Sequence, residues 1–587
     1  MIRPTPAIVT QAGARRLPRW ALLGLCLAYI LPGFVGREPW KTADVAAYGI
    51  MRWMANGEID WWQPLIPGQL GSMAGQLPHW LGALLMMAWP AQADWLHRLP
   101  SMLALACTLY FTWHAVFRFA LLGPAQPVTF AFGGQAQPVD YARALADSGL
   151  LALMACLGLA QLAHEATPDV FLTTGISAVL YASARLAHGD RVSTSTTLAC
   201  WVGGLLVLGL SGMPWLTLVV ATAVPAWLAW DNLARSPRTN AEVNSQADSV
   251  TPHLLPQVAG LATLSVSAIL WWTAPWTAPE SQGGFTTLQA GSFLKMLVWF
   301  TWPVWPLAAW TCWRWKHLIR QAHIALPLIF ITLIALSSAV AGGSDRVMML
   351  ALPALAVLAA FALPTLTRHV SALIDWFSVL FFSFCATVVW VIWIAMLTGT
   401  PAKPAANVAR LAPGFEASFD GWAFAVALAA SLGWLGVVAW RVTRHPPAIW
   451  KSMVLPATGV TLCWLLLMTL WLPLLDHGRS YGPLAKRLAK QLPPETCLAT
   501  LGLNTAQLAG LAHQGGITLD RKPHGQSPCQ HLVASPLHPD VSRLPQEGWQ
   551  LTARFNRLTD NKESLLLYRR APAAQPLADV LVSEDVN

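Results

Sequence analysis

The chain has 587 residues, of which 55% are hydrophobic and only 11% are charged. Because soluble domains carry about 25% charged residues, this composition excludes an ordinary soluble globular protein and indicates a polytopic membrane protein. The net charge of +9 does not indicate nucleic-acid binding here, since Lys and Arg collect in the cytoplasmic loops of membrane proteins.

Long apolar runs predict the membrane helices. A crossing takes about 20 residues, and the chain offers about thirteen such runs. A shorter apolar segment at 77–90 is predicted to lie along the membrane surface. The predicted fold is therefore an α-helical polytopic membrane protein, with spans near 18–36, 100–121, 147–163, 170–188, 196–211, 214–230, 256–274, 294–313, 324–341, 347–366, 372–398, 421–440 and 452–475.

Basic residues predict the orientation of these helices. If the N-terminus is cytoplasmic, the loops after even-numbered helices hold most of the positive charge, whereas the opposite loop 277–293 holds none. This asymmetry agrees with the positive-inside rule. An odd number of spans then places the C-terminus outside. The cytoplasmic loops contain Arg185, Arg235, Arg314, Arg368 and Arg441.

The first outer loop, residues 37–99 of a membrane domain that covers 1–475, contains the first candidate site. Asp44 lies just past the first span, and carboxylates at a bilayer face are costly and tend to be functional. An aromatic belt with solvated acids and snorkelling cations would give the same composition, so an ordinary interfacial loop is the alternative. The side chains here that suit a sugar or a phosphate are Arg37, Lys41, Tyr48 and Arg52.

Two further outer turns are predicted to lie on the same face. Asp169 enters the fourth span after Thr167 and Pro168, where it suits either catalysis or a helix cap. Arg346 opens the tenth span, where it suits either a lipid phosphate or the membrane interface. The topology therefore predicts that Asp44 and Asp169 meet at the outer face.

Residues 476–587 are richer in charge and are predicted to form a small extracytoplasmic α/β domain. Short β-like runs occur at 497–501, 531–534 and 564–568, with helical patterns at 481–491 and 504–513. Cys497 and Cys529 lie in this part. They form a disulfide if it faces an oxidising compartment, and two free thiols are the alternative. No Cys or His cluster has zinc spacing.

The whole chain resembles the GT-C membrane glycosyltransferases. It is most similar to the family-39-like branch that contains the protein O-mannosyltransferases and the lipid A aminoarabinose transferase. The residues that carry this resemblance are Asp44 and Tyr48 in an Asp-x-x-x-Tyr element, Thr167-Pro168-Asp169, the Trp-Pro-x-x-Pro helix 302–306, Arg346 ahead of Leu352-Pro353, and the run Ser480-Tyr481-Gly482-Pro483-Leu484.

The resemblance implies an inverting transfer of a sugar from a polyprenyl-phosphate carrier to a lipid or protein acceptor. The reaction would occur at the periplasmic face of a bacterial inner membrane. Asp44 would be the general base or would orient the acceptor hydroxyl. Asp169 would help to form the acceptor site or position the base, and Lys41 or Arg346 would stabilise the phosphate leaving group.

The chain departs from the family at two places in the first outer loop. Val45 follows Asp44 where the family often has Glu, and 75–78 reads Gly-Gln-Leu-Pro where bacterial relatives often have Glu-Lys-Pro-Pro. These changes remove an acid that could hold a metal and a Lys that could hold phosphate. No cofactor or metal ligand is therefore assigned, and a role for a divalent metal stays open. The departures fit a divergent subfamily or a member without activity.

Two other functions stay open at this point. A transporter or flippase of lipid-linked saccharides would have the same membrane architecture. However, transporters usually place ionisable residues near the bilayer midplane, whereas these acids lie at one face. An inactive scaffold of envelope assembly would bind the donor without turnover.

Overall fold

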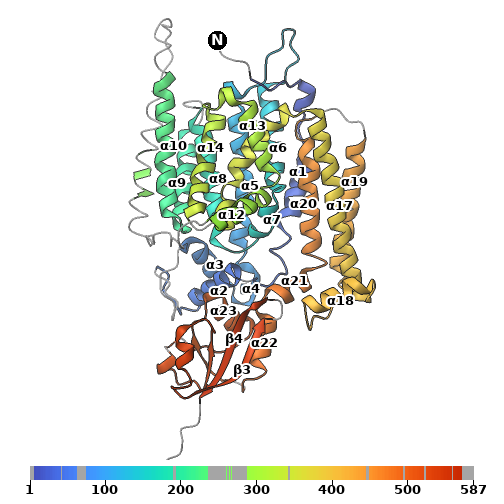
Figure 1. The fold of residues 1–587 in the computed structure, drawn as a ribbon. Coiled ribbons are helices and arrows are strands. Elements are labelled where there is room, and N and C mark those ends of the chain that lie inside the picture. Colours follow the sequence, from blue (N-terminus) through green and yellow to red (C-terminus); the bar gives the residue numbers. More distant parts are fainter. Residues whose placement is uncertain are drawn as a thin grey trace, which may run out of the picture.

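The computed structural model describes residues 5–40, 42–62, 75–188, 193–235, 260, 263–264, 266–267, 287–340, 344–443, 448–493, 496–520, 522, 524–557 and 560–570. A tall helical bundle stands on a smaller region that contains a β-sheet (Figure 1). Lys41 and most of the predicted span 256–274 lie outside the described residues.

The bundle is built from apolar helices. Its helices are α1 (Arg19–Ile30), α5 (Leu99–Ala120), α6 (Pro138–Met154), α7 (Leu157–Leu162), α8 (Pro168–Leu186), α9 (Thr194–Leu210), α10 (Pro214–Arg235), α12 (Thr287–Phe300), α13 (Val304–Arg314), α14 (Ala322–Val340), α15 (Asp345–Met349), α16 (Leu352–Ala362), α17 (Arg368–Thr398), α19 (Gly421–Val442) and α20 (Lys451–Leu467). Single-turn segments are η1 (Gln11–Ala14), η2 (Pro90–Gln92), η3 (Gly123–Ala125), η6 (Lys316–Leu318), η7 (Leu363–Thr365), η8 (Gly510–Gln514), η9 (His524–Gln526) and η10 (Pro539–Arg543).

Several apolar runs are broken into two helices, so the predicted number of spans is not confirmed. Within the described residues, four helices are long and apolar enough to cross a membrane, or five if the bent pair α20 and α21 (Leu472–Arg479) is one span. The predicted span 294–313 is divided at Pro303 into α12 and α13, because proline has no amide hydrogen to continue a helix. Similarly, α21 bends by 71° from α20. We place the membrane boundary at the end of α20, because α21 carries Asp476, His477 and Arg479.

The sheet lies at the opposite end of the molecule from η1 (Figure 1). Its order is β1-β2-β4-β3, with β1 and β2 parallel and the other pairs antiparallel. Three of these strands were predicted, and β3 was not. Cys497 and Cys529 form a disulfide near the starts of β1 and β2. The elements are β1 (Leu498–Leu501), β2 (His531–Ala534), β3 (Trp549–Arg557), β4 (Asp560–Arg570), α22 (Gly482–Ala489) and α23 (Thr505–Ala509).

Short helices fill the junction between the bundle and the sheet (Figure 1). They are α2 (Ala43–Ala55), α3 (Gln76–Ala88) and α4 (Ala93–Leu96), with α18 (Ala402–Leu411) and α21 at the same level. Helix α3 covers most of segment 77–90, for which a position along the membrane surface was predicted.

The chain enters the junction through a tight turn after α1. Gly33 has a φ of +92°, and a Cβ atom there would lie 2.5 Å from a ring carbon of Trp464. The same Trp464 donates its indole hydrogen to the Pro32 carbonyl at 2.9 Å. Only glycine fits this contact without strain, and the contact fixes the first outer loop against α20.

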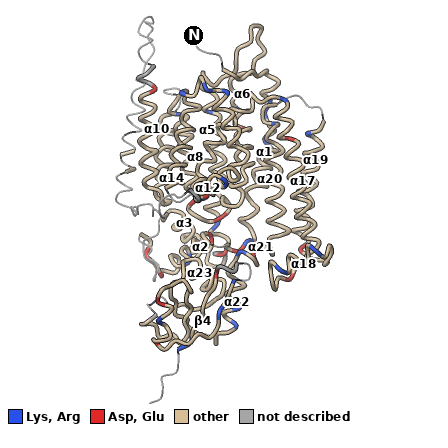
Figure 2. Tube along the Cα trace, viewed as in Figure 1, with Lys and Arg blue, Asp and Glu red and all other residues tan. Residues whose placement is uncertain are grey.

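Charged residues avoid the middle of the bundle. Figure 2 shows acidic and basic residues intermixed along the backbone at the junction with the sheet, and further Lys and Arg at the opposite end. This distribution agrees with a membrane-embedded middle, because ionisable groups are costly in hydrocarbon. The junction is therefore where polar chemistry can occur.

Candidate active site

Asp44 joins the two predicted outer motifs. It lies in the first turn of α2, and its side chain is fully buried. One carboxylate oxygen accepts hydrogen bonds from Arg37 at 2.8 Å and from the Trp40 amide at 3.0 Å. The other accepts the amide of Ala166 at 2.9 Å. The first outer loop and the α7–α8 turn therefore meet at Asp44, whereas Asp169 itself bonds Arg346.

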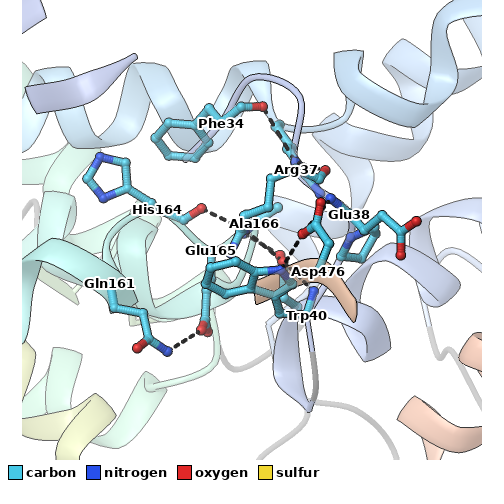
Figure 3. Close-up of polar contacts among 12 residues, drawn as sticks. Phe34, Arg37, Glu38, Trp40, Gln161, His164, Glu165, Ala166 and Asp476 are labelled. Carbon is cyan, nitrogen blue, oxygen red and sulfur yellow. Dashed lines mark hydrogen bonds and ion pairs between the residues drawn. The ribbon is translucent and has the colours of Figure 1, made fainter. Parts of the chain in front are cut away.

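Two buried arginines surround this carboxylate. Arg37 also donates to the His164 carbonyl at 3.0 Å (Figure 3). Arg98 donates to the carbonyls of Arg37 and Phe34. Arg37 and Arg98 are 4% and 2% exposed. Burial by itself would raise the pKa of Asp44, but Arg37, Arg98 and the two backbone amides outweigh it and lower the pKa. Asp44 is therefore held as an enclosed carboxylate.

Arg346 gathers a second pair of acids from the α7–α8 turn. Its guanidinium bonds Glu165 at 2.5 Å and Asp169 at 2.8 Å. Pro168 is the first residue of α8, a position that suits its fixed φ, and this start places Asp169 in the first helical turn. The Asp169 oxygen that faces Arg346 also accepts the Thr167 hydroxyl at 3.1 Å.

Asp169 has an available oxygen, whereas Glu165 is enclosed. Among the described residues, no group donates a hydrogen bond to Asp169 Oδ1, and this side chain is 16% exposed. The Glu165 side chain is 2% exposed. Burial raises the pKa of Glu165, and the negative charge of Asp44 adds to this effect, so that Arg346 only partly offsets it.

Trp40 connects this cluster to α21. Its indole nitrogen donates to Asp476 at 2.7 Å, and the Glu38 amide donates to the same oxygen at 3.3 Å (Figure 3). The guanidinium groups of Arg37 and Arg479 lie 4.5 Å and 5.0 Å from the Trp40 ring centroid. Burial raises the pKa of Asp476 to about 6, and the hydrogen bond from Trp40 opposes that rise.

The remaining predicted residues of the first loop form a separate group. The Tyr48 hydroxyl donates to Asp94 at 2.7 Å, and Arg52 lies 3.4 Å from the same carboxylate. Burial raises the pKa of Tyr48 to about 12, and the bond to Asp94 adds to this. Tyr48 and Arg52 thus bond Asp94 rather than Asp44. Lys41 lies outside the described residues.

Sequence reasoning did not single out Arg98, Glu165, Asp476 or Arg479. Glu165 stands four residues before Asp169, and its nearness to a second acid was the available signal. Arg98 and Asp476 stand at the edges of predicted spans, where a charge could have been read as buried rather than interfacial. Nothing in the sequence pairs Trp40 with a residue 436 positions later.

At the junction, the acids Asp44, Glu165 and Asp169 are bonded by arginines. Among the described residues, no three His, Cys, Asp or Glu side chains are grouped as metal ligands. Asp44 bonds Arg37, and both Glu165 and Asp169 bond Arg346. These carboxylates would have to leave their arginines to bind a cation, so we derive no step through a metal.

Comparisons with solved structures identify the fold. The chain superposes on ArnT from Cupriavidus metallidurans bound to undecaprenyl phosphate, with a TM-score of 0.58 and 16% identity over 93% of this chain and 97% of that one. The apo state of ArnT gives a TM-score of 0.54 and 15% identity over 94% and 96%. No family model matches the chain, and no curated protein matches its sequence. The chain has the fold of ArnT.

Proposed function

We propose that this protein is a glycosyltransferase that moves a sugar from a polyprenyl-phosphate carrier to a lipid or protein acceptor. The proposal puts the reaction at the periplasmic face of a bacterial inner membrane. The observation that carries it is the meeting of the first outer loop, the α7–α8 turn and the start of α15 in one charged cluster beside the bundle. The fold adds support, because ArnT was solved with undecaprenyl phosphate bound.

The orientation rests on two independent features. The disulfide between Cys497 and Cys529 suits an oxidising compartment. The cytoplasmic loops inferred from positive charge belong to the end of the bundle away from the sheet (Figure 2). Both features favour a periplasmic sheet region, with the charged cluster on that side.

The chemistry proposed is a single displacement with inversion. The acceptor hydroxyl oxygen forms a bond to the anomeric carbon, while the bond from that carbon to the carrier phosphate oxygen breaks. The electron pair of the broken bond stays on the phosphate, and the hydroxyl proton passes to a carboxylate. A general base must be within hydrogen-bond reach of that proton, and Asp169 has an oxygen available for it.

Asp44 is assigned a positioning role in this proposal. Both of its oxygens are bonded and no part of its side chain is exposed. It cannot accept a proton from a substrate without losing the contacts that join the two loops. Of the two roles that the family resemblance implies for Asp44, general base or orientation of the acceptor hydroxyl, we therefore propose the base role for Asp169 instead.

A transfer assay tests the proposal. Purified full-length protein would be given a panel of radiolabelled undecaprenyl-phosphate sugars, with envelope lipids and proteins as acceptors. We expect a labelled product from the wild type, and a loss of about 10²–10⁴-fold in kcat for Asp169→Asn. Sugar that accumulates inside sealed proteoliposomes without a covalent product would instead support the transporter. Full activity in Asp169→Asn would exclude its base role.

A further inference from the structure

Most cations of the junction already have anionic or carbonyl partners. Arg346 bonds two carboxylates, and Arg37 bonds Asp44 and a carbonyl. Arg98 is buried and bonds two carbonyls, while Arg52 lies beside Asp94. A phosphate that approached any of these would have to displace an existing partner.

Arg479 differs from these cations. It is the last residue of α21, it is partly exposed, and its guanidinium lies against the Trp40 ring. Within the described part of the chain, its side chain forms no ion pair within 4 Å and donates no hydrogen bond, and the charge of Glu165 acts on it only from a longer distance. A guanidinium has five N–H donors. Stacking on an aromatic face leaves their in-plane directions open, so Arg479 can still bind an anion.

The sheet region fixes the backbone on both sides of Arg479. Arg557 of β3 is 3% exposed and donates to the carbonyls of Gly478 and Ser480, each at 3.2 Å. The Arg557 guanidinium also lies 4.9 Å from the Tyr481 ring centroid and pairs with Glu563. Gln514 donates to the Pro39 carbonyl and accepts the Tyr481 amide, which joins the sheet region to the first outer loop. Such support holds a binding group in place before the ligand arrives.

We infer that Arg479 binds the phosphate of the lipid carrier, with Trp40 as its platform. This inference rests on the proposed function and assigns its phosphate contact. The carrier phosphodiester gains negative charge when the bond to the sugar breaks, because the departing oxygen keeps the electron pair. Arg479 ends α21, the polar helix that follows the proposed membrane boundary at the end of α20. A guanidinium there stabilises this charge more in the transition state than in the bound donor.

A binding experiment tests the assignment. Full-length protein in nanodiscs would be titrated with undecaprenyl phosphate, undecaprenol and inorganic phosphate. We expect Arg479→Gln to lower the affinity for undecaprenyl phosphate about ten- to hundredfold, as expected for a lost charge-assisted hydrogen bond. Undecaprenol, which lacks the phosphate, should bind more weakly than undecaprenyl phosphate and with equal affinity to the wild type and Arg479→Gln. Equal affinity of Arg479→Gln and wild type for undecaprenyl phosphate would overturn the inference and leave the proposed function intact.

Control variants separate binding from structure. Arg487→Gln removes an exposed arginine of α22 that lies 6.0 Å from the Phe555 ring centroid, and it should bind as the wild type does. Arg479→Lys should recover part of the affinity, since a point charge replaces a planar fork. In the transfer assay, Arg479→Gln should lower kcat more than it raises KM. Inorganic phosphate that binds as tightly as the lipid would assign the site to free phosphate and overturn the lipid assignment. A wild type without affinity for undecaprenyl phosphate would overturn both proposals.

Discussion

The α7–α8 turn contacts two arginine–carboxylate groups that differ in their exposure to solvent. The Arg37–Asp44 pair is completely enclosed, and backbone amides saturate its carboxylate. The Arg346 group keeps about a quarter of its arginine exposed and one oxygen of Asp169 available. The same kind of arginine–carboxylate pair therefore has two different roles. The enclosed pair holds two loops together, whereas the open group can exchange partners with a substrate.

The largest effect is expected from the enclosed pair. Asp44→Ala removes the one carboxylate that Arg37 bonds among the described residues and leaves the buried Arg37 without an ion-pair partner, a loss that costs about 3–5 kcal/mol of stability. Asp169→Ala should cost less than about 1 kcal/mol, because solvent reaches the group and Arg346 keeps Glu165. The apparent melting temperature of the purified variants, followed by Trp fluorescence, measures both. Equal melting temperatures of Asp44→Ala and wild type would remove the distinction between the two groups.

The open group gives an intermediate and pH-dependent effect. Arg346→Gln removes charge-assisted hydrogen bonds to Glu165 and Asp169, worth about 1.5–3 kcal/mol. The pKa of Glu165 is already raised, and loss of Arg346 raises it further. A carboxyl with a raised pKa in the folded state contributes stability at low pH, and this contribution is lost as pH rises through that pKa.

Melting curves at pH 5 and pH 8 check this sign. The difference between wild type and Arg346→Gln should be larger at pH 8, where Glu165 must carry a buried and unpaired charge. Asp345→Asn is a matched control in the same helical turn, because Asp345 accepts the backbone amide of Arg346 and does not bond the Arg346 side chain. A difference that shrinks as pH rises would contradict the assignment of the raised pKa to Glu165.

Much of the helical architecture was predictable from the sequence. Apolar runs located α17 and α19 closely, because an uninterrupted run of hydrophobic side chains has one stable form in lipid. The breaks before α13 and α21 were not predicted. A membrane helix can contain a proline or a bend, and tertiary packing decides whether the helix breaks there. Strand β3 was missed because most of its nine residues are exposed and few are buried, so its sequence lacks an apolar pattern.

The candidate site was predictable in part for a similar reason. Topology alone brought the loops of Asp44 and Asp169 to one face, because alternation of helices assigns each loop to a side. It could not show that Asp44 is enclosed, since burial depends on Arg37, Arg98 and Ala166 arriving from three segments. The contact between Trp40 and Asp476 joins positions 436 residues apart, and no local pattern encodes such a pair.

The smallest expected effect concerns Asp476, a half-buried acid with an environment intermediate between the two groups. Burial raises its pKa to about 6 in the folded state, above the usual value of 3.8. Its contribution to stability is therefore complete below about pH 4 and is lost as pH rises through about 6. The loss should be at most about 1 kcal/mol, because solvent screens part of the interaction.

Asp476→Asn keeps an acceptor for the Trp40 indole and does not titrate, so its melting temperature should change less than that of the wild type between pH 4.5 and pH 7. A wild-type melting temperature that rises relative to the variant over this range would show that the carboxylate is stabilised by its charge. Asp476 would then belong with the enclosed carboxylate Asp44, whose lowered pKa gives the opposite dependence on pH.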